Sequence, residues 1–114
     1  MWRLLLILPL LLAGCSKGAE ADLPAIGEAG SLGAEWALVN EQANKGRLTQ
    51  VYVATMRKQL RDQLQTTLAS LAQPQSPYGD QIRVLLGEPD DAPPDQLRQS
   101  VLKLKQIEDS LESA

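Results

Sequence analysis

The sequence predicts a small all-α domain, and three observations favour this fold class. Apolar residues recur every three or four positions over long segments, which is the period of one helix face. No segment shows the sustained apolar–polar alternation that is typical of a strand. The chain has no Phe, only 2 Trp and only 2 Tyr, so the core must consist mainly of aliphatic residues, which suit helices. We therefore expect about three antiparallel helices within residues 33–114.

Residues 1–14 have the parts of a secretory signal peptide. Arg3 supplies positive charge, an apolar run follows over residues 4–12, and two small residues complete the segment. A membrane-spanning helix needs about 20 apolar residues, so this run is about half the required length. Pro9 also interrupts it. We expect cleavage of this segment rather than a membrane span.

The segment Leu12-Ala13-Gly14-Cys15 resembles the lipobox of bacterial lipoproteins. This resemblance implies cleavage between Gly14 and Cys15, and acylation of both the thiol and the new amino group of Cys15. Several acyl chains anchor a protein firmly, because each buried CH₂ contributes about 0.8 kcal/mol. By analogy with Gram-negative members, Ser16 in place of Asp favours the outer membrane, facing the periplasm. Membrane lipid is then one partner of the chain, and no cofactor other than this covalent lipid is expected.

Residues 15–32 are predicted to be the lipidated cysteine and a flexible tether. The segment is rich in Gly, Ala and Glu, contains Pro24 and lacks sustained periodicity. A flexible chain of about 15 residues spans roughly 20–25 Å on average. The folded domain would then hang near the membrane without being pressed against it.

The first helix is predicted over about 33–72. One apolar stripe begins at Trp36, and a second, longer stripe begins at Leu48. The two are out of phase, and Gly46, a weak helix former, lies between them. Either one long helix has a soft point there, or two helices meet at a bend. Pro74 ends the segment, because the residue before a proline disfavours helix.

Two shorter helices are predicted over 77–86 and 94–112. The first begins with Ser76 as its N-cap and a proline at the first helical position, and it ends at Gly87. The second begins after a Pro-Pro pair, and the carboxylate of Asp95 suits the positive end of its dipole.

The predicted lengths leave part of the first helix uncovered. At 1.5 Å per residue, the predicted helices 33–72, 77–86 and 94–112 are about 60, 15 and 28 Å long. The two shorter helices can therefore cover only the C-terminal half of the first. The uncovered stripe comprises Trp36, Val39, Val51 and Tyr52. Three arrangements remain open. A bend buries the stripe internally, the stripe binds a partner protein or a second copy, or the helix is exposed and frayed.

Charge follows a related pattern. The stretch 45–61 carries only basic charges, and acidic residues gather around residues 88–95. Either the two groups match within the molecule at a solvated surface, or the basic residues form a face for anionic lipid, glycan or an acidic protein. The predicted anion-binding face consists of Lys45, Arg47, Arg57, Lys58 and Arg61.

Little in the sequence supports catalysis or metal binding. There is no His, and the only Cys is the one in the lipobox. The pair Asp90-Asp91 lies in a Pro-rich turn and lacks a calcium-loop pattern. Removing Arg3 with the leader leaves 10 basic and 14 acidic residues, and this net charge of −4 argues against nucleic acid as a partner. No catalytic or metal site is expected.

The sequence thus predicts a non-enzymatic, lipid-anchored protein of the bacterial cell envelope. Its helical domain would act as an adaptor or assembly factor for a protein complex, binding its partner or a second copy through the first helix. In size and architecture it is similar to the helical pilotins, a likeness that rests on association alone. The alternatives are a homo-oligomeric spacer of the envelope, and a lipoprotein that binds anionic lipid or glycan.

Overall fold

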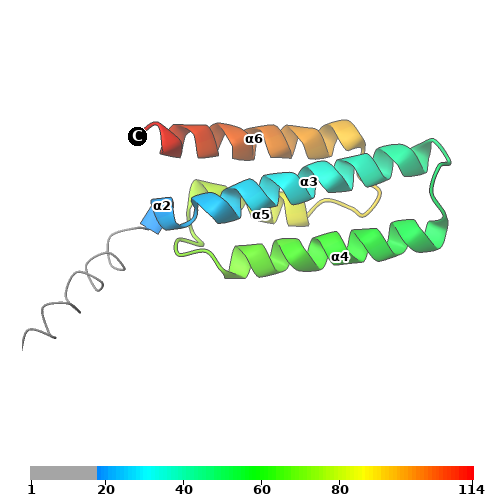
Figure 1. The fold of residues 1–114 in the computed structure, drawn as a ribbon, viewed down its shortest axis with the longest axis horizontal. Helices are drawn as coiled ribbons and strands as arrows, with labels where there is room; N and C mark the ends of the chain where they lie inside the picture. Colours follow the sequence, from blue (N-terminus) through cyan, green and yellow to red (C-terminus); the bar gives the residue numbers. More distant parts are fainter. Residues whose placement is uncertain (1–17) are drawn as a thin grey trace, which may run out of the picture.

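The computed structural model describes residues 18–114 and confirms the all-α fold class (Figure 1). The described residues form five helices rather than the three expected, and the first of these is a single turn. The helices are α2 (Gly18–Ala21), α3 (Leu23–Asn44), α4 (Gln50–Ala69), α5 (Pro77–Leu86) and α6 (Pro94–Glu112). The predicted signal peptide and Cys15 lie outside the described residues.

The four longer helices form an up-and-down bundle. Helix α3 packs against α4 and α6, and α5 packs against the same two helices from the other side. In Figure 1, α3 crosses the view between α6 and α4, and the shorter α5 passes behind it. Short connections make each helix antiparallel to the one before it. The chain therefore returns to its starting side, and the C-terminus lies at the same end of the bundle as α2 (Figure 1).

The predicted tether over 15–32 is wrong from Gly18 onward. Ile26, Ala29 and Leu32 are buried in the core, with exposed fractions of 1%, 0% and 6%. Their spacing continues upstream the helical stripe that the sequence shows from Trp36. The boundary of the folded domain therefore lies at about residue 18 rather than 33.

Small residues in α3 serve close packing rather than flexibility. A Cβ atom added to Gly33 would lie 2.8 Å from Val101 of α6 and 3.0 Å from Leu85 of α5. A larger residue at position 33 would therefore require the side chain of Val101 to shift and that of Leu85 to give way slightly, so glycine lets the three helices meet closely there. The Gly- and Ala-rich sequence that resembles a linker therefore forms a helix that is buried in the bundle.

A single continuous helix over 33–72 is also wrong, and the alternative of two helices meeting near Gly46 is confirmed. Helix α3 ends at Asn44, and Gly46 adopts φ +69°, a conformation that favours glycine after a helix C-terminus. Its backbone N–H donates to the carbonyl oxygen of Ala43. The Thr49 hydroxyl then caps α4 by accepting a hydrogen bond from the backbone N–H of Tyr52.

The predicted helices at 77–86 and 94–112 are confirmed with the same boundaries. The Ser76 hydroxyl caps α5 by accepting from the backbone N–H of Gly79. Within residues 18–114, no helix has the length and apolar character needed to cross a membrane. The largest fully buried side chains come from all four long helices and are Ile26, Trp36, Asn40, Leu60, Leu64, Ile82, Leu85, Leu97 and Leu104.

Candidate functional site

The predicted partner-binding stripe is divided between the core and the surface. Trp36 and Val39 are buried, with exposed fractions of 1% and 6%, whereas Val51 and Tyr52 are exposed at 79% and 49%. The turn at Gly46 folds α4 back along α3, and so one half of the stripe is covered internally. The interpretation of these four residues as one binding surface is wrong, and only the two in α4 remain accessible.

Trp36 instead helps to anchor the connection 87–93, which joins α5 to α6. Its indole Nε1 donates a hydrogen bond of 3.0 Å to the backbone carbonyl oxygen of Asp90. The guanidinium of Arg61 lies over the Trp36 ring, 4.8 Å from the ring centroid, which is a cation–π distance. A buried aromatic residue thus connects the core to a loop that is exposed over much of its length.

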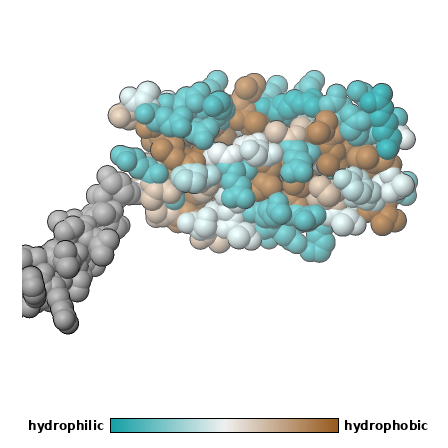
Figure 2. All heavy atoms as spheres, viewed as in Figure 1, coloured by the Kyte–Doolittle hydropathy of each residue, from teal (hydrophilic) through white to brown (hydrophobic). Residues whose placement is uncertain are grey.

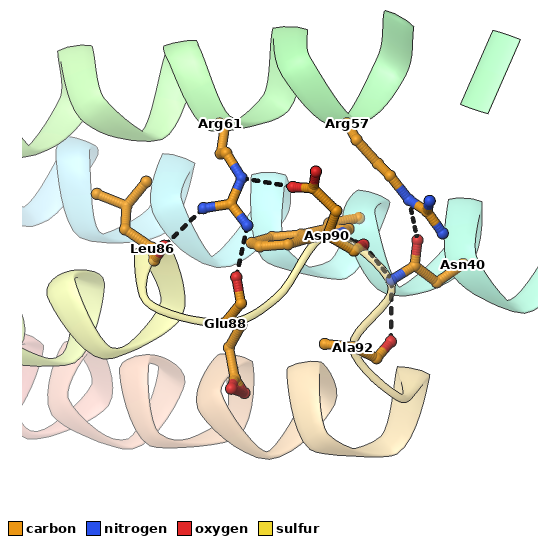
Figure 3. Close-up of polar contacts among 8 residues, drawn as sticks. Asn40, Arg57, Arg61, Leu86, Glu88, Asp90 and Ala92 are labelled. Atoms are coloured by element: carbon orange, nitrogen blue, oxygen red, sulfur yellow. Dashed lines mark hydrogen bonds and ion pairs between the residues drawn. The ribbon is translucent and has the colours of Figure 1, made fainter. Parts of the chain in front are cut away.

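Arg61, in α4, holds this connection and the end of α5. It points from α4 toward the loop, donates to the carbonyl oxygens of Leu86 and Glu88, and pairs with the Asp90 carboxylate at 2.8 Å (Figure 3). Because α5 ends at Leu86, the connection has no helical hydrogen bonds of its own to satisfy these carbonyls. The planar fork of an arginine supplies the missing donors.

Asn40 completes the anchoring from α3. Its Nδ2 atom donates to the carbonyl oxygens of Asp90 and Ala92, at 3.0 and 2.9 Å, and its Oδ1 atom accepts from Nε of Arg57 at 2.9 Å (Figure 3). The residue is 1% exposed, so these bonds satisfy a polar group that would otherwise be costly to bury. We call Trp36, Asn40, Arg57 and Arg61 the loop-anchoring network.

The five predicted basic residues do not form one anion-binding face. Arg57 and Arg61 are half-buried in the loop-anchoring network. Of the other three, Lys45 pairs with Glu41 at 3.5 Å, Lys58 pairs with Asp62 at 2.8 Å, and Arg47 donates to the side chain of Gln42. The expected match between the basic stretch and the acidic loop is confirmed for Arg61 and Asp90.

Replacing Arg61 with Ala is expected to lower the free energy of unfolding by about 2–3 kcal/mol, because two carbonyl groups lose their donor and Trp36 loses its cation. Urea denaturation followed by circular dichroism measures this change. Lys58→Ala is the matched control, because its ion pair is exposed and is expected to contribute less than about 1 kcal/mol. Equal midpoints for the two variants would contradict an anchoring role for Arg61.

A second polar cluster, which sequence reasoning missed, lies where α3 begins. The buried carboxylate of Asp22 accepts hydrogen bonds from the backbone N–H groups of Ala72 and Gln73, at 2.7 and 3.0 Å, and from the Tyr78 hydroxyl at 2.6 Å. We call Asp22 and Tyr78, with the two backbone groups, the junction cluster. It ties the start of the bundle to the connection 70–76.

The ionisation of the junction cluster follows from its contacts. Burial raises the pKa of Asp22, but the hydrogen bonds from Tyr78, Ala72 and Gln73 outweigh burial and leave the pKa below its ordinary value of 3.8. Burial and the hydrogen bond to Asp22 raise the pKa of the Tyr78 hydroxyl. Asp22 is therefore an anion at neutral pH, and Tyr78 is its neutral donor.

One sequence signal could have located this cluster. Asp22 stands immediately before Leu23-Pro24, which places a proline in the first turn of α3. The same order of a capping residue and a proline correctly marked Ser76-Pro77. The carboxylate of Asp22 does not cap its own helix, however, because it is turned toward the connection 70–76.

The remaining exposed apolar residues gather partly near the α3–α4 turn. Leu38 is 51% exposed on α3, and Val51 and Tyr52 follow the turn in α4. The cations Lys45 and Arg47 lie in the turn itself and are also exposed. We call these five residues the distal surface. Figure 2 shows one face of the bundle, on which apolar residues form small groups among polar ones rather than one continuous patch.

The described residues form a polar groove at the surface of the bundle that combines residues of α3 and α4. This shallow groove is lined mainly by Thr, Gln and Ser side chains together with three charged residues. Within residues 18–114, no buried side-chain nitrogen or oxygen atom lacks a hydrogen-bond partner, so no such group is directed at a ligand. No group of His, Cys, Asp and Glu in this range could hold a metal ion.

The helix order and the polar networks define an up-and-down four-helix bundle with one short helix and an anchored connection. Comparison with protein-family models, curated proteins and solved structures finds no match to this chain. Its function must therefore be inferred from its own residues.

Proposed function

We propose that this chain is a lipid-anchored protein of the bacterial envelope whose helical bundle binds another envelope protein as a non-enzymatic adaptor or assembly factor. The observation that carries the proposal is the lipobox-like segment ending at Cys15, directly ahead of a bundle that begins at Gly18. Such a segment assigns a compartment and an anchor, and the bundle supplies the part that acts there.

The distal surface supports binding to a protein. Tyr52 and Val51 are large side chains that stay exposed although the neighbouring Val53 is buried in the core. Aromatic residues are enriched where proteins bind one another, and Lys45 and Arg47 provide a polar rim. The loop-anchoring network and the junction cluster, in contrast, use their polar groups within the bundle and therefore act in folding.

A homo-oligomeric spacer remains the second candidate, because the same exposed apolar residues could meet their copies across a two-fold axis. Binding of anionic lipid or glycan by the basic stretch is less well supported, since two of its five residues are committed to the loop-anchoring network.

Replacing Cys15 with Ser is expected to abolish membrane anchoring, because the acylated thiol is removed. The wild-type protein should stay in the membrane fraction after a high-salt wash, and the variant should be released. Mass spectrometry of the N-terminal peptide checks acylation directly. A Cys15→Ser variant that still sediments with membranes after the wash would show that the lipoprotein proposal is wrong.

Photo-crosslinking in cells tests the partner. A photoreactive residue replacing Tyr52 in the lipidated protein should give one dominant foreign protein, identified by mass spectrometry. The matched control is the same residue at Gln99, an exposed position on α6. Self-crosslinks from Tyr52 would favour the spacer. The absence of any protein adduct specific to Tyr52 would contradict a binding role for the distal surface.

A further inference from the structure

The link between the proposed anchor and the bundle is very short. Only residues 16 and 17 separate Cys15 from Gly18, the first residue of α2. A fully extended chain advances at most about 3.6 Å per residue, so the Cα atoms of Cys15 and Gly18 are within about 11 Å of each other. The flexible tether of roughly 20–25 Å that the composition predicted therefore does not exist.

This reach places one end of the bundle beside the anchor. We call the end formed by α2, the connection 70–76 and the C-terminus of α6 the proximal end; these segments lie together in Figure 1. The junction cluster holds two of its parts together, because Asp22 bonds to the backbone of Ala72 and Gln73. The turn between α3 and α4 lies at the opposite end. The 22 residues of α3 separate the two ends by about 33 Å at 1.5 Å per residue.

The connection 70–76 is suited to a position against lipid headgroups. Its sequence, SLAQPQS, contains no charged residue, and its four central residues, 72–75, are exposed. Uncharged residues can approach the headgroups without the large penalty of removing a charge from water. Glu20 and the last turn of α6 add acidic residues at the same end, and Lys17 in the link adds one cation, so this end carries no excess of positive charge that would attract anionic lipid. The anchor alone accounts for the contact.

The sides of the bundle are less suited to the membrane. Exposed ion pairs lie along them, including Lys58 with Asp62 on α4 and Lys105 with Asp109 on α6. The chain after Gly14 carries a net charge of −4, because it retains 10 basic and 14 acidic residues. Laying these sides against lipid would remove their charged groups from water, and this cost opposes a bundle that lies flat.

We infer that the bundle stands on the bilayer by its proximal end, with the connection 70–76 facing phospholipid headgroups and the turn between α3 and α4 about 33 Å farther out. This inference rests on the lipid anchor of the proposed function. It identifies the membrane contact as an uncharged loop, and it places the partner beyond the headgroup layer. The exposed cations Lys45 and Arg47 are then held away from the membrane that anchors the chain.

Energy transfer to labelled lipid tests the orientation. The lipidated protein, purified from membranes, is reconstituted into phosphatidylcholine vesicles that carry an acceptor dye on a headgroup. A donor is attached to Gln75→Cys at the proximal end, or to Gln50→Cys at the distal end. The two variants are matched, because both replace an exposed glutamine and acylation of Cys15 leaves no other thiol. The dye pair is chosen so that its Förster distance, at which half of the energy is transferred, is shorter than the length of α3, about 33 Å.

Transfer from position 75 is expected to exceed transfer from position 50 several-fold. Equal transfer from the two positions, or stronger transfer from position 50, would overturn the upright orientation. Unchanged thermal melting of both variants shows that the labels leave the bundle folded.

A longer link provides the control for the anchor. Inserting a flexible Gly/Ser segment of about 15 residues between Ser16 and Lys17 adds roughly 20 Å of reach, and it should reduce transfer from position 75. The mass of the N-terminal peptide separates the two proposals. An acylated protein without the expected difference overturns the orientation alone, whereas an unacylated Cys15 overturns the proposed function together with it.

Discussion

Replacing Trp36 with Ala is expected to lower the free energy of unfolding by about 4 kcal/mol, which corresponds to about 20 °C in Tm for a domain of this size. The indole is 1% exposed, so its removal leaves a large cavity between α3 and its neighbours. The Asp90 carbonyl also loses the hydrogen bond from the indole, and Arg61 loses the ring that it covers. Thermal and urea denaturation measure the change.

Val51→Ala is the control for Trp36→Ala. Both residues belong to the stripe that the sequence analysis treated as one surface, but Val51 is 79% exposed. Its truncation is expected to change the stability by less than about 0.5 kcal/mol. A Trp36→Phe variant should lie between wild type and Trp36→Ala, because it keeps an aromatic ring but loses the donor. Equal stability of Trp36→Ala and Val51→Ala would contradict the burial of Trp36.

Replacing Asp22 with Asn is expected to lower the free energy of unfolding by about 2 kcal/mol at neutral pH. The carboxylate accepts hydrogen bonds from two backbone N–H groups and from the Tyr78 hydroxyl. An amide of the same shape has only one acceptor oxygen, and its NH₂ group would face a donor. One bond of the junction cluster is thus lost at a residue that is 3% exposed.

The effect of Asp22→Asn is also expected to depend on pH. The pKa of Asp22 is lower in the folded state than its ordinary value of 3.8, which is close to that of the unfolded chain. Ionised Asp22 therefore stabilises the fold above about pH 4, and this contribution is lost as the pH falls through the lowered folded pKa. The difference between wild type and variant should be constant near neutrality and should shrink in acid.

Asp62→Asn is the control for the acid titration. Its carboxylate is exposed and pairs with Lys58 on the surface, so its replacement is expected to change stability by less than about 1 kcal/mol at every pH. Urea midpoints measured between neutral pH and about pH 3 compare the three proteins. A difference for Asp22→Asn that persists undiminished in acid would show that the charge of Asp22 contributes nothing.

Local signals predicted half of the fold well. The ends of α5 and α6 agree with the prediction because short-range signals set them. Each helix begins at a proline, which follows a capping serine in α5 and another proline in α6. A glycine follows α5, and a serine follows α6. Gly46 was identified correctly as the weak point, since a positive φ is a property of one residue. The pairing of Arg61 with Asp90 agrees with the alternative in which the basic stretch and the acidic residues at 88–95 match within the molecule.

Long-range contacts explain what the sequence could not show. In α3, Ala29 and Ala37 are fully buried and Gly33 lies against α5 and α6, yet such small residues contribute little to an apolar pattern. The segment therefore resembled a linker. Asn40 likewise interrupts an apolar stripe, and only a connection 50 residues farther along the chain reveals the partners of its amide group. For Trp36 and Val39, the structure selects the alternative in which a bend buries the stripe internally, which the sequence alone left open.

The four long helices alternate in direction, so the chain enters and leaves the bundle at the same end (Figure 1). Reporter domains fused after Ala114 would consequently lie beside α2, at the end of the bundle where the described chain begins. A reporter inserted between Lys45 and Thr49 would stand at the opposite pole, joined only to the turn between α3 and α4. The fold thus places both ends of the described chain at one pole of the bundle and the turn between α3 and α4 at the other.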